Sequence, residues 1–203
     1  MEYYELHLQN PQLRFINKAV EILKKGGIII YPTDTVYGIG CDIFNKDALE
    51  KIFSIKNDNN SKLFSFVCSS LKDISNYAKV SDFAYRTMKH LLPGPYTFIL
   101  PAAKQVPKKL WSKRKTVGIR VPNHSITLTL VEELGNPIIS TSATNRKGEI
   151  LIDPTEIKNI FNSQVDLMLA AGNLNNNPSS VVDLSSDEPE ILRKGAGDVS
   201  IFE

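Results

Sequence analysis

The sequence predicts an α/β fold built on a mixed sheet. Apolar segments of strand length alternate with amphipathic helical segments as far as residue 141, and further strand-like segments follow towards the C-terminal end. Alternation of this kind is typical of a sheet covered by helices, whereas consecutive strands usually pair antiparallel. The 203 residues suffice for one core without disulfides or metal, and no repeat or low-complexity linker divides them. We therefore expect a single domain over residues 1–203.

The first half of the chain has clear helix boundaries. A helix is predicted over residues 11–25, because Asn10-Pro11 is a typical start and Gly26-Gly27 a typical end. The apolar strand 28–31 then stops at Pro32, which has no backbone N–H for a central ladder. The other elements expected in this half are a helix from Asn45 to about Lys56, a strand at 64–68, and helices at 70–78 and 82–92, the last capped by Ser81.

The second half continues the alternation and then becomes rich in strands. Turn residues and apolar runs define these elements. In order, they are strands at 96–100 and 117–121, a helix around Ile126 and Leu130 that ends at Gly135, a strand at 137–141, a short helix from Asp153-Pro154, and strands near 166–170, 180–184 and 189–193.

Composition narrows the class of protein. Cys41 and Cys68 lie in apolar contexts without the Cys-x-x-Cys spacing of a zinc or redox site, so we expect them to be reduced core residues. Residues 1–5 do not resemble a signal peptide, and no uninterrupted apolar run approaches the length of a membrane span. We therefore expect a cytoplasmic protein that does not cross a membrane.

Charge is unevenly distributed along the chain. Residues 104–120 contain seven Lys and Arg and no Asp or Glu, although the net charge of the whole chain is only +2. A basic stretch with Trp111 inside it suits the phosphates of a nucleotide or of RNA, but a solvated lysine loop has the same composition. The candidate RNA-binding residues in this stretch are Lys108, Lys109, Lys113, Arg114 and Lys115.

The chain lacks several common catalytic motifs. It has no Gly-x-x-x-x-Gly-Lys-Ser/Thr phosphate loop, and Gly38-x-Gly40 lacks the third glycine of a dinucleotide fingerprint. His7, His90 and His124 are scattered without metal-ligand spacing or a nucleophile elbow. The sequence thus predicts neither a metal site nor a hydrolase triad.

Hydroxyl-rich segments beside predicted strands form the candidate site. In open α/β sheets ligands bind outside the carboxyl ends of strands, and glycines such as Gly38 and Gly40 let a backbone approach a ligand closely. An ordinary turn would contain the same residue types. Hydroxyls with isolated cations suit a small zwitterion and a polyphosphate. The residues concerned are Thr33-Asp34-Thr35, residues 140–145, Ser179-Ser180, Lys56, Lys62, Arg120 and Arg193.

Six ordered segments, covering essentially the whole chain, resemble the YrdC-like family of threonylcarbamoyl-AMP synthases. Pro32-Thr-Asp-Thr-Val-Tyr-Gly-Ile-Gly40 is similar to the family signature Pro-Thr-Asp/Glu-Thr-Val-Tyr-Gly-Leu. Residues 96–100 and the short C-terminal end are most like the YciO branch. The other five segments are Leu92-Pro-Gly-Pro-Tyr-Thr-Phe-Ile99, Thr116-Val-Gly-Ile-Arg-Val-Pro122, Ser140-Thr-Ser-Ala143, Ser179-Ser-Val-Val-Asp183 and Ile191-Leu-Arg-Lys-Gly195.

The resemblance implies a YrdC-like twisted mixed sheet, flanked by helices, around a concave basic site for L-threonine, bicarbonate and ATP. It implies formation of threonylcarbamoyl-AMP and pyrophosphate, with the adenylate serving the modification of adenosine 37 of tRNA. Magnesium would arrive with the phosphates and need few protein ligands. By position, Thr33, Arg120, Ser140 and Ser179 would hold the amino acid, Lys56, Lys62, Thr116, Ser142 and Arg193 would hold ATP, and Lys56, Ser142 and Arg120 would be catalytic.

The sequence departs from the family pattern at the residues expected to do the chemistry. The family's Lys-x-Arg becomes Lys56-Asn57-Asp58, and its Lys-Pro-Leu becomes Lys62-Leu63-Phe64. Its Ser-x-Asn becomes Ser142-Ala143-Thr144, with Asn145 one place late. If an Asp faces a triphosphate in place of an Arg, electrostatic attraction becomes repulsion. The change in interaction energy is on the order of several kcal/mol at an effective dielectric constant near 20.

Three functions are therefore compatible with the sequence. The first is a threonylcarbamoyl-AMP synthase, weakened by the two replacements. The second is a non-catalytic protein that binds double-stranded RNA or tRNA with the same concave basic surface, by shape and phosphate contacts. The third is a nucleotide-dependent enzyme with another acyl acceptor.

Overall fold

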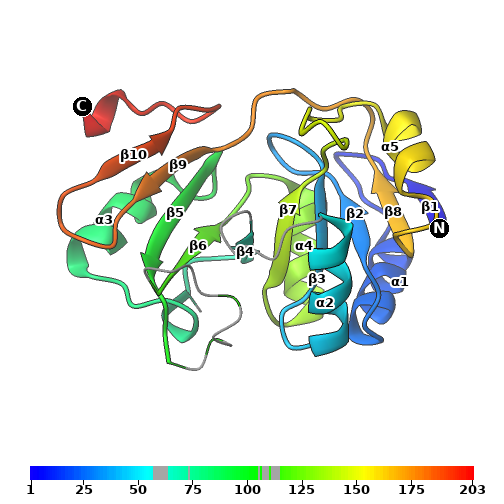
Figure 1. Cartoon of the computed structure of the whole chain (residues 1–203), viewed down its shortest axis with the longest axis horizontal. Coiled ribbons are helices and arrows are strands. Elements are labelled where there is room, and N and C mark those ends of the chain that lie inside the picture. Colours follow the sequence, from blue (N-terminus) through cyan, green and yellow to red (C-terminus); the bar gives the residue numbers. More distant parts are fainter. Residues whose placement is uncertain (57–63, 73, 105, 107–109, 111–114) are drawn as a thin grey trace.

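The computed structural model has a ten-stranded mixed sheet with helices on both faces (Figure 1). It describes residues 1–56, 64–72, 74–104, 106, 110 and 115–203. The strand order is β1-β8-β2-β3-β7-β4-β6-β5-β9-β10. The pairs β1/β8, β2/β8, β4/β6 and β5/β9 are parallel, and the other neighbours are antiparallel. The mixed α/β sheet predicted from the sequence is thus confirmed.

The elements follow the predicted order with small shifts at their ends. The strands are β1 Glu2–Glu5, β2 Ile29–Tyr31, β3 Gly38–Asp42, β4 Ser65–Val67, β5 Tyr96–Pro101, β6 Thr116–Arg120, β7 Ile138–Ser142, β8 Leu167–Ala170, β9 Ser180–Asp183 and β10 Glu190–Arg193. The helices are α1 Leu13–Lys24, α2 Lys46–Ile55, α3 Asp82–Leu91, α4 Ser125–Leu134 and α5 Pro154–Phe161, with short 3-10 turns at Ile74–Asn76 and Ser200–Phe202.

Two hydrophobic clusters lie on opposite faces of the sheet. Helices α1 and α4 pack on one face against β2, where Ile29 and Tyr31 are fully buried. The larger cluster on the other face joins α2, α3 and α5 to strand residues such as Ile30, which lies between Ile29 and Tyr31 on β2. This alternation is the period of two expected for a sheet buried on both faces.

Side-chain caps determine where three of the helices begin. The Asn45 Oδ1 accepts from the Ala48 N–H at 3.0 Å, and Ser81 and Asp153 cap α3 and α5 in the same way. Gly135 ends α4 with a φ of +82°, the left-handed conformation that glycine adopts without strain. The first helix differs from prediction, because its N-cap is Gln12 rather than Asn10 and makes no side-chain cap.

Strand β3 was not predicted, because its glycines were interpreted as ligand-binding loop residues. In the structure Gly38 and Gly40 pair with β2 and β7 and lie beside the ring of Tyr31. A Cβ at Gly40 would lie 2.4 Å from Ile138 Cγ2 and 3.0 Å from Tyr31 Cε1. The close approach that requires glycine here is therefore made by Tyr31, and this corrects the interpretation of Gly40 as a ligand contact.

Two other predictions need correction. The edge strand β1 was missed because its exposed and half-buried residues lack an apolar pattern, although it pairs with β8. The helix predicted over 70–78 is only the 3-10 turn Ile74–Asn76 in the described part of that segment. Ala78 instead forms a β-bridge with Ala102, so the chain leaves the turn to lie beside the end of β5.

The predicted burial of both cysteines is confirmed. Cys41 and Cys68 are both buried, and burial raises the pKa of the Cys41 thiol. Among the residues that the structure describes, no helix combines the length and apolarity needed to span a membrane.

Gly40→Ala is expected to destabilise the protein by roughly 1–3 kcal/mol, because the added methyl group must displace Ile138 or Tyr31 in a packed core. Urea unfolding followed by circular dichroism would measure the change in the free energy of unfolding. An unchanged midpoint would contradict this account of the glycine.

Candidate functional site

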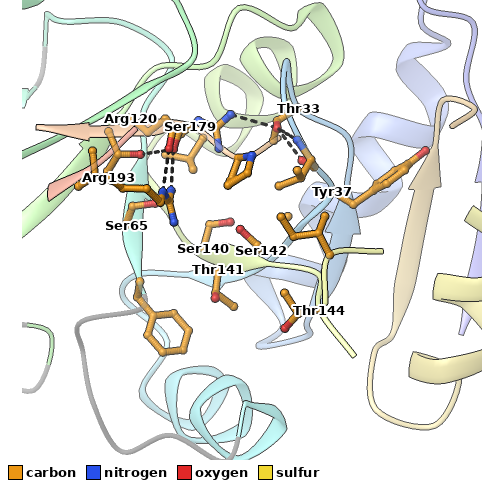
Figure 2. A pocket seen from close by; sticks show the side chains of 18 of the residues that line it. Thr33, Tyr37, Ser65, Arg120, Ser140, Thr141, Ser142, Thr144, Ser179 and Arg193 are labelled. Carbon is orange, nitrogen blue, oxygen red and sulfur yellow. Dashed lines mark hydrogen bonds between the residues drawn. The ribbon is translucent and has the colours of Figure 1, made fainter. Parts of the chain in front are cut away.

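A cavity of about 380 Å³ lies where the β2–β3 loop meets the middle strands of the sheet. Its walls come from segments far apart in the sequence, namely the β2–β3 loop, the end of α2, and strands β4, β5, β6, β7, β9 and β10 (Figure 2). The polar and charged side chains that line it are Thr33, Tyr37, Lys56, Ser65, Thr97, Arg120, Ser140, Thr141, Ser142, Thr144, Ser179 and Arg193.

The cavity lining is cationic in the part of the chain that the structure describes. Lys56, Arg120 and Arg193 line it, and no described Asp or Glu does. Burial, together with repulsion from Arg120, lowers the pKa of the Arg193 guanidinium. An anion between the two guanidinium groups would relieve both effects, so the site favours a negatively charged ligand.

The Thr33 hydroxyl is fully engaged by its own loop and by Arg120. It donates to the Val36 carbonyl at 2.6 Å and accepts from the backbone N–H groups of Thr35 and Val36, each at 3.2 Å. It also accepts from Arg120 Nη2 at 3.1 Å. With one proton and two lone pairs already engaged, the hydroxyl is a scaffold for the loop and for Arg120.

Arg120 is held by a buried ion pair. Its Nη2 lies 2.6 Å from Asp34 Oδ1 and 2.7 Å from Thr35 Oγ1, and each side chain of the ion pair is only 10% exposed. The other carboxylate oxygen of Asp34 accepts from the Asn123 N–H at 3.0 Å. The Arg120 Nε is buried without a hydrogen-bond partner among the described residues. An unpaired buried donor is costly, so an anionic ligand that approached this side of Arg120 would be favoured.

His124 lies next to this ion pair, at the start of α4. Both of its ring nitrogens are buried and have no hydrogen-bond partner within the described part of the chain. Burial lowers the pKa of His124, and the nearby Asp34 carboxylate opposes that shift. The neutral imidazole is therefore favoured beside the paired Arg120.

Two serine hydroxyls are each fixed from behind by a second residue. The Tyr31 hydroxyl donates to Ser140 Oγ at 2.6 Å. Ser179 Oγ lies 2.8 Å from Thr97 Oγ1 and accepts from Arg193 Nη2 at 3.2 Å, while Arg193 Nε donates to the Ser179 carbonyl at 2.9 Å. Figure 2 shows Ser140 and Ser142 side by side in the cavity and Arg193 reaching Ser179.

A register shift between β9 and β10 places the Arg193 side chain on the face of the sheet that lines the cavity. Strand β10 pairs Ile191 with Val182 but Arg193 with Val181, so one residue is accommodated in a bulge. Val181 lines the cavity, and residues paired across a sheet share a face. Without the bulge, Arg193 would project from the opposite face.

Lys56 extends from the end of α2 to strand β7. Its Nζ donates to the Ser142 carbonyl at 3.0 Å and to Thr144 Oγ1 at 2.6 Å. The neighbouring Asn145 points elsewhere, because its side chain binds Glu149 and the backbone of an exposed turn. Thr144 therefore takes the place beside Lys56, and Asn145 does not substitute for the family asparagine.

The structure gathers seven of the predicted site residues around the cavity, namely Thr33, Lys56, Arg120, Ser140, Ser142, Ser179 and Arg193. Thr116 is the first residue of β6 and Arg120 the last, so the two side chains lie on the same face of the sheet. Arg120 lines the cavity, whereas Thr116 is not among the lining residues. Lys115 is exposed and precedes that strand. The other predicted residues, Asp58, Lys62, Lys108, Lys109, Lys113 and Arg114, lie outside the described residues.

Tyr31, Ser65 and Thr97 were missed as contributors to the site. Tyr31 was included in the apolar strand 28–31 without a role of its own, while Ser65 and Thr97 lie in strands with apolar neighbours on both sides. Their polarity within apolar strands was the available signal. Whether these side chains would lie on the same face of the sheet as the cavity depended on the pairing of strands that are distant in the sequence.

Known proteins share this fold and much of this sequence. The Sua5/YciO/YrdC family model, which carries the description "Telomere recombination", matches residues 21–195. YciO of Escherichia coli is 44% identical over 99% of this chain and 98% of its own, and its crystal structure superimposes with a TM-score of 0.95 over the full length of both chains.

Two more distant relatives have names or bound molecules that suggest an activity. A threonylcarbamoyl-AMP synthase of Coxiella burnetii is 36% identical over 76% of this chain and 83% of its own. The crystal structure of P. abyssi Sua5 complexed with L-threonine has a TM-score of 0.89 at 25% identity, and the match covers 96% of this chain and 58% of that one. The chain belongs to the Sua5/YciO/YrdC family.

Proposed function

We propose that the protein is an ATP-dependent L-threonylcarbamoyl-AMP synthase of reduced activity, whose product serves the modification of adenosine 37 in tRNA in the cytoplasm. The observation that carries the proposal is the lining of the cavity, which combines several hydroxyl groups with the cations Lys56, Arg120 and Arg193. No described carboxylate lines the cavity. Such a wall suits a ligand with a carboxylate and phosphates. The binding of L-threonine by a relative with the same fold supports the choice of amino acid.

In the proposed reaction, bicarbonate loses hydroxide to give CO2, and the threonine amine adds to the carbon of CO2 to give a carbamate. The proton lost by the amine combines with the hydroxide and leaves as water. A carbamate oxygen then attacks the α-phosphorus of ATP, and the bond to the bridging oxygen breaks to release pyrophosphate. Arg120, which lines the cavity and whose buried Nε has no hydrogen-bond partner among the described residues, would bind the amino-acid carboxylate. Holding both reactants in one cavity replaces a collision between them by a unimolecular step.

The cations would act on the phosphate side of the same cavity. Lys56 and Arg193 would offset the charge that develops on the α-phosphate and the leaving group, and the Ser142 hydroxyl lines the same cavity. Thr116 and Lys62 remain proposed ATP contacts. Magnesium would be bound mainly by the phosphates themselves. Thr33 would act by holding Arg120, because its hydroxyl is engaged within the loop.

The proposal makes a direct prediction for the purified protein. Pyrophosphate release is expected only when L-threonine, bicarbonate and ATP are all present, and omission of threonine should abolish it. A coupled pyrophosphate assay, with mass spectrometry for the adenylate, would measure this. ATP consumption that is independent of threonine would point to another acyl acceptor, and no consumption at all would point to the RNA-binding alternative.

Asp34→Asn tests whether the ion pair with Asp34 positions Arg120 for substrate binding. The change leaves a buried guanidinium without its counter-ion, so we expect a loss of about 3 kcal/mol in the free energy of unfolding. The KM for L-threonine should rise more than the KM for ATP, since Arg120 would face the carboxylate. Equal increases in both constants would argue against that assignment.

Thr144 and Asp58 should account for the reduced activity. The double variant Asp58→Arg/Thr144→Asn is expected to raise kcat/KM for ATP, whereas Thr144→Val should lower it several-fold by removing a hydrogen bond to Lys56. Asn145→Ala is the matched control, since Asn145 only organises an exposed turn. An unchanged rate in the double variant would show that these replacements are not responsible.

A further inference from the structure

Tyr31 is buried in an unusual way for a strand residue. Its ring lies across β3, where a Cβ on Gly38 would meet Tyr31 Cζ at 3.0 Å and Ser140 Oγ at the same distance. Both Gly38 and Gly40 are thus needed to let a tyrosine lie between β2 and β7. Two glycines inside one short strand weaken it, so a simple need for apolar filling does not explain the arrangement.

The Tyr31 hydroxyl has one function in the structure. It donates to Ser140 Oγ at 2.6 Å, in a region where Tyr31 has no exposed surface and Ser140 only 5%. Burial raises the pKa of the Tyr31 phenol, an effect that Ser140 and Arg120 oppose without cancelling. The phenol therefore keeps its proton at physiological pH and acts as the donor in this pair.

This bond limits what the Ser140 hydroxyl can do. One of its lone pairs is occupied by Tyr31, and the protein acceptor for its own proton, the Ile39 carbonyl, lies at 3.4 Å, near the limit for a hydrogen bond. A ligand oxygen in the cavity would be a better acceptor. The Ser140 hydroxyl is therefore oriented to donate a hydrogen bond to a ligand oxygen.

We propose that Tyr31 is a positioning residue that orients the Ser140 hydroxyl as a hydrogen-bond donor to a carboxylate-type oxygen of the amino-acid substrate. The identity of the substrate rests on the proposed function. Tyr31 does not touch the substrate, since it is fully covered behind Ser140. Its contribution reaches the ligand only through the serine, and that dependence can be measured.

The test is a double-mutant cycle of Tyr31→Phe and Ser140→Ala, read by calorimetric titration with L-threonine and, separately, with ATP. Tyr31→Phe keeps the ring over the glycines and is expected to raise the Kd for L-threonine about fivefold, with the Kd for ATP unchanged. In the Ser140→Ala background the same change should have no further effect, because the hydroxyl through which it acts is gone.

Tyr96→Phe is the matched control, because it removes a hydroxyl that donates to the Asp198 carbonyl outside the cavity lining. Thermal unfolding of all variants separates a loss of binding from a loss of folding. Equal effects of Tyr31→Phe with and without Ser140, or equal effects on threonine and ATP, would overturn the inference.

The wild-type titration distinguishes the two levels of the proposal. If the wild-type protein neither binds L-threonine nor turns it over, the proposed function fails and the positioning inference fails with it. If the wild-type protein binds threonine and Tyr31→Phe binds it equally well, only the positioning inference fails.

Discussion

The buried ion pair between Arg120 and Asp34 is the interaction on which the cavity depends. It connects the end of β6 to the loop between β2 and β3, and the hydroxyls of Thr33 and Thr35 contact the same Nη2. Removing two charges from water is costly, and the arrangement holds because the carboxylate also accepts from the Asn123 N–H. The pair engages Nη2 of the guanidinium, whereas the buried Nε has no hydrogen-bond partner among the described residues.

A second layer of residues behind the cavity wall fixes the direction of its hydroxyls. Tyr31 supports Ser140, while Thr97 and Arg193 support Ser179. All three supporting residues lie on strands, and the Tyr31 ring packs closely against Gly38 and Gly40 of the adjacent strand. Polar groups supported in this way lose little freedom when a ligand binds, which favours recognition by geometry as well as by charge.

The replacement of asparagine by threonine in the family pattern has a structural consequence. Thr144 Oγ1 accepts a hydrogen bond from Lys56 Nζ, and this ammonium also contacts the Ser142 carbonyl. Lys56 Nζ therefore donates hydrogen bonds to two neutral oxygens at the end of β7. The same turn commits Asn145 to Glu149 and to backbone groups, so an amide one position later in the sequence has no access to the cavity.

The sequence by itself determined the order of most elements, several helix caps and the identity of most polar residues in the cavity, because these depend on local patterns such as Asn45 at a helix start. It did not reveal β3, whose glycines make sense only beside Tyr31. It also did not show which side chains share a face, since a single bulge in β10 turns Arg193 towards Ser179. Those outcomes depend on the pairing of strands far apart in the chain, and only the tertiary structure sets that register.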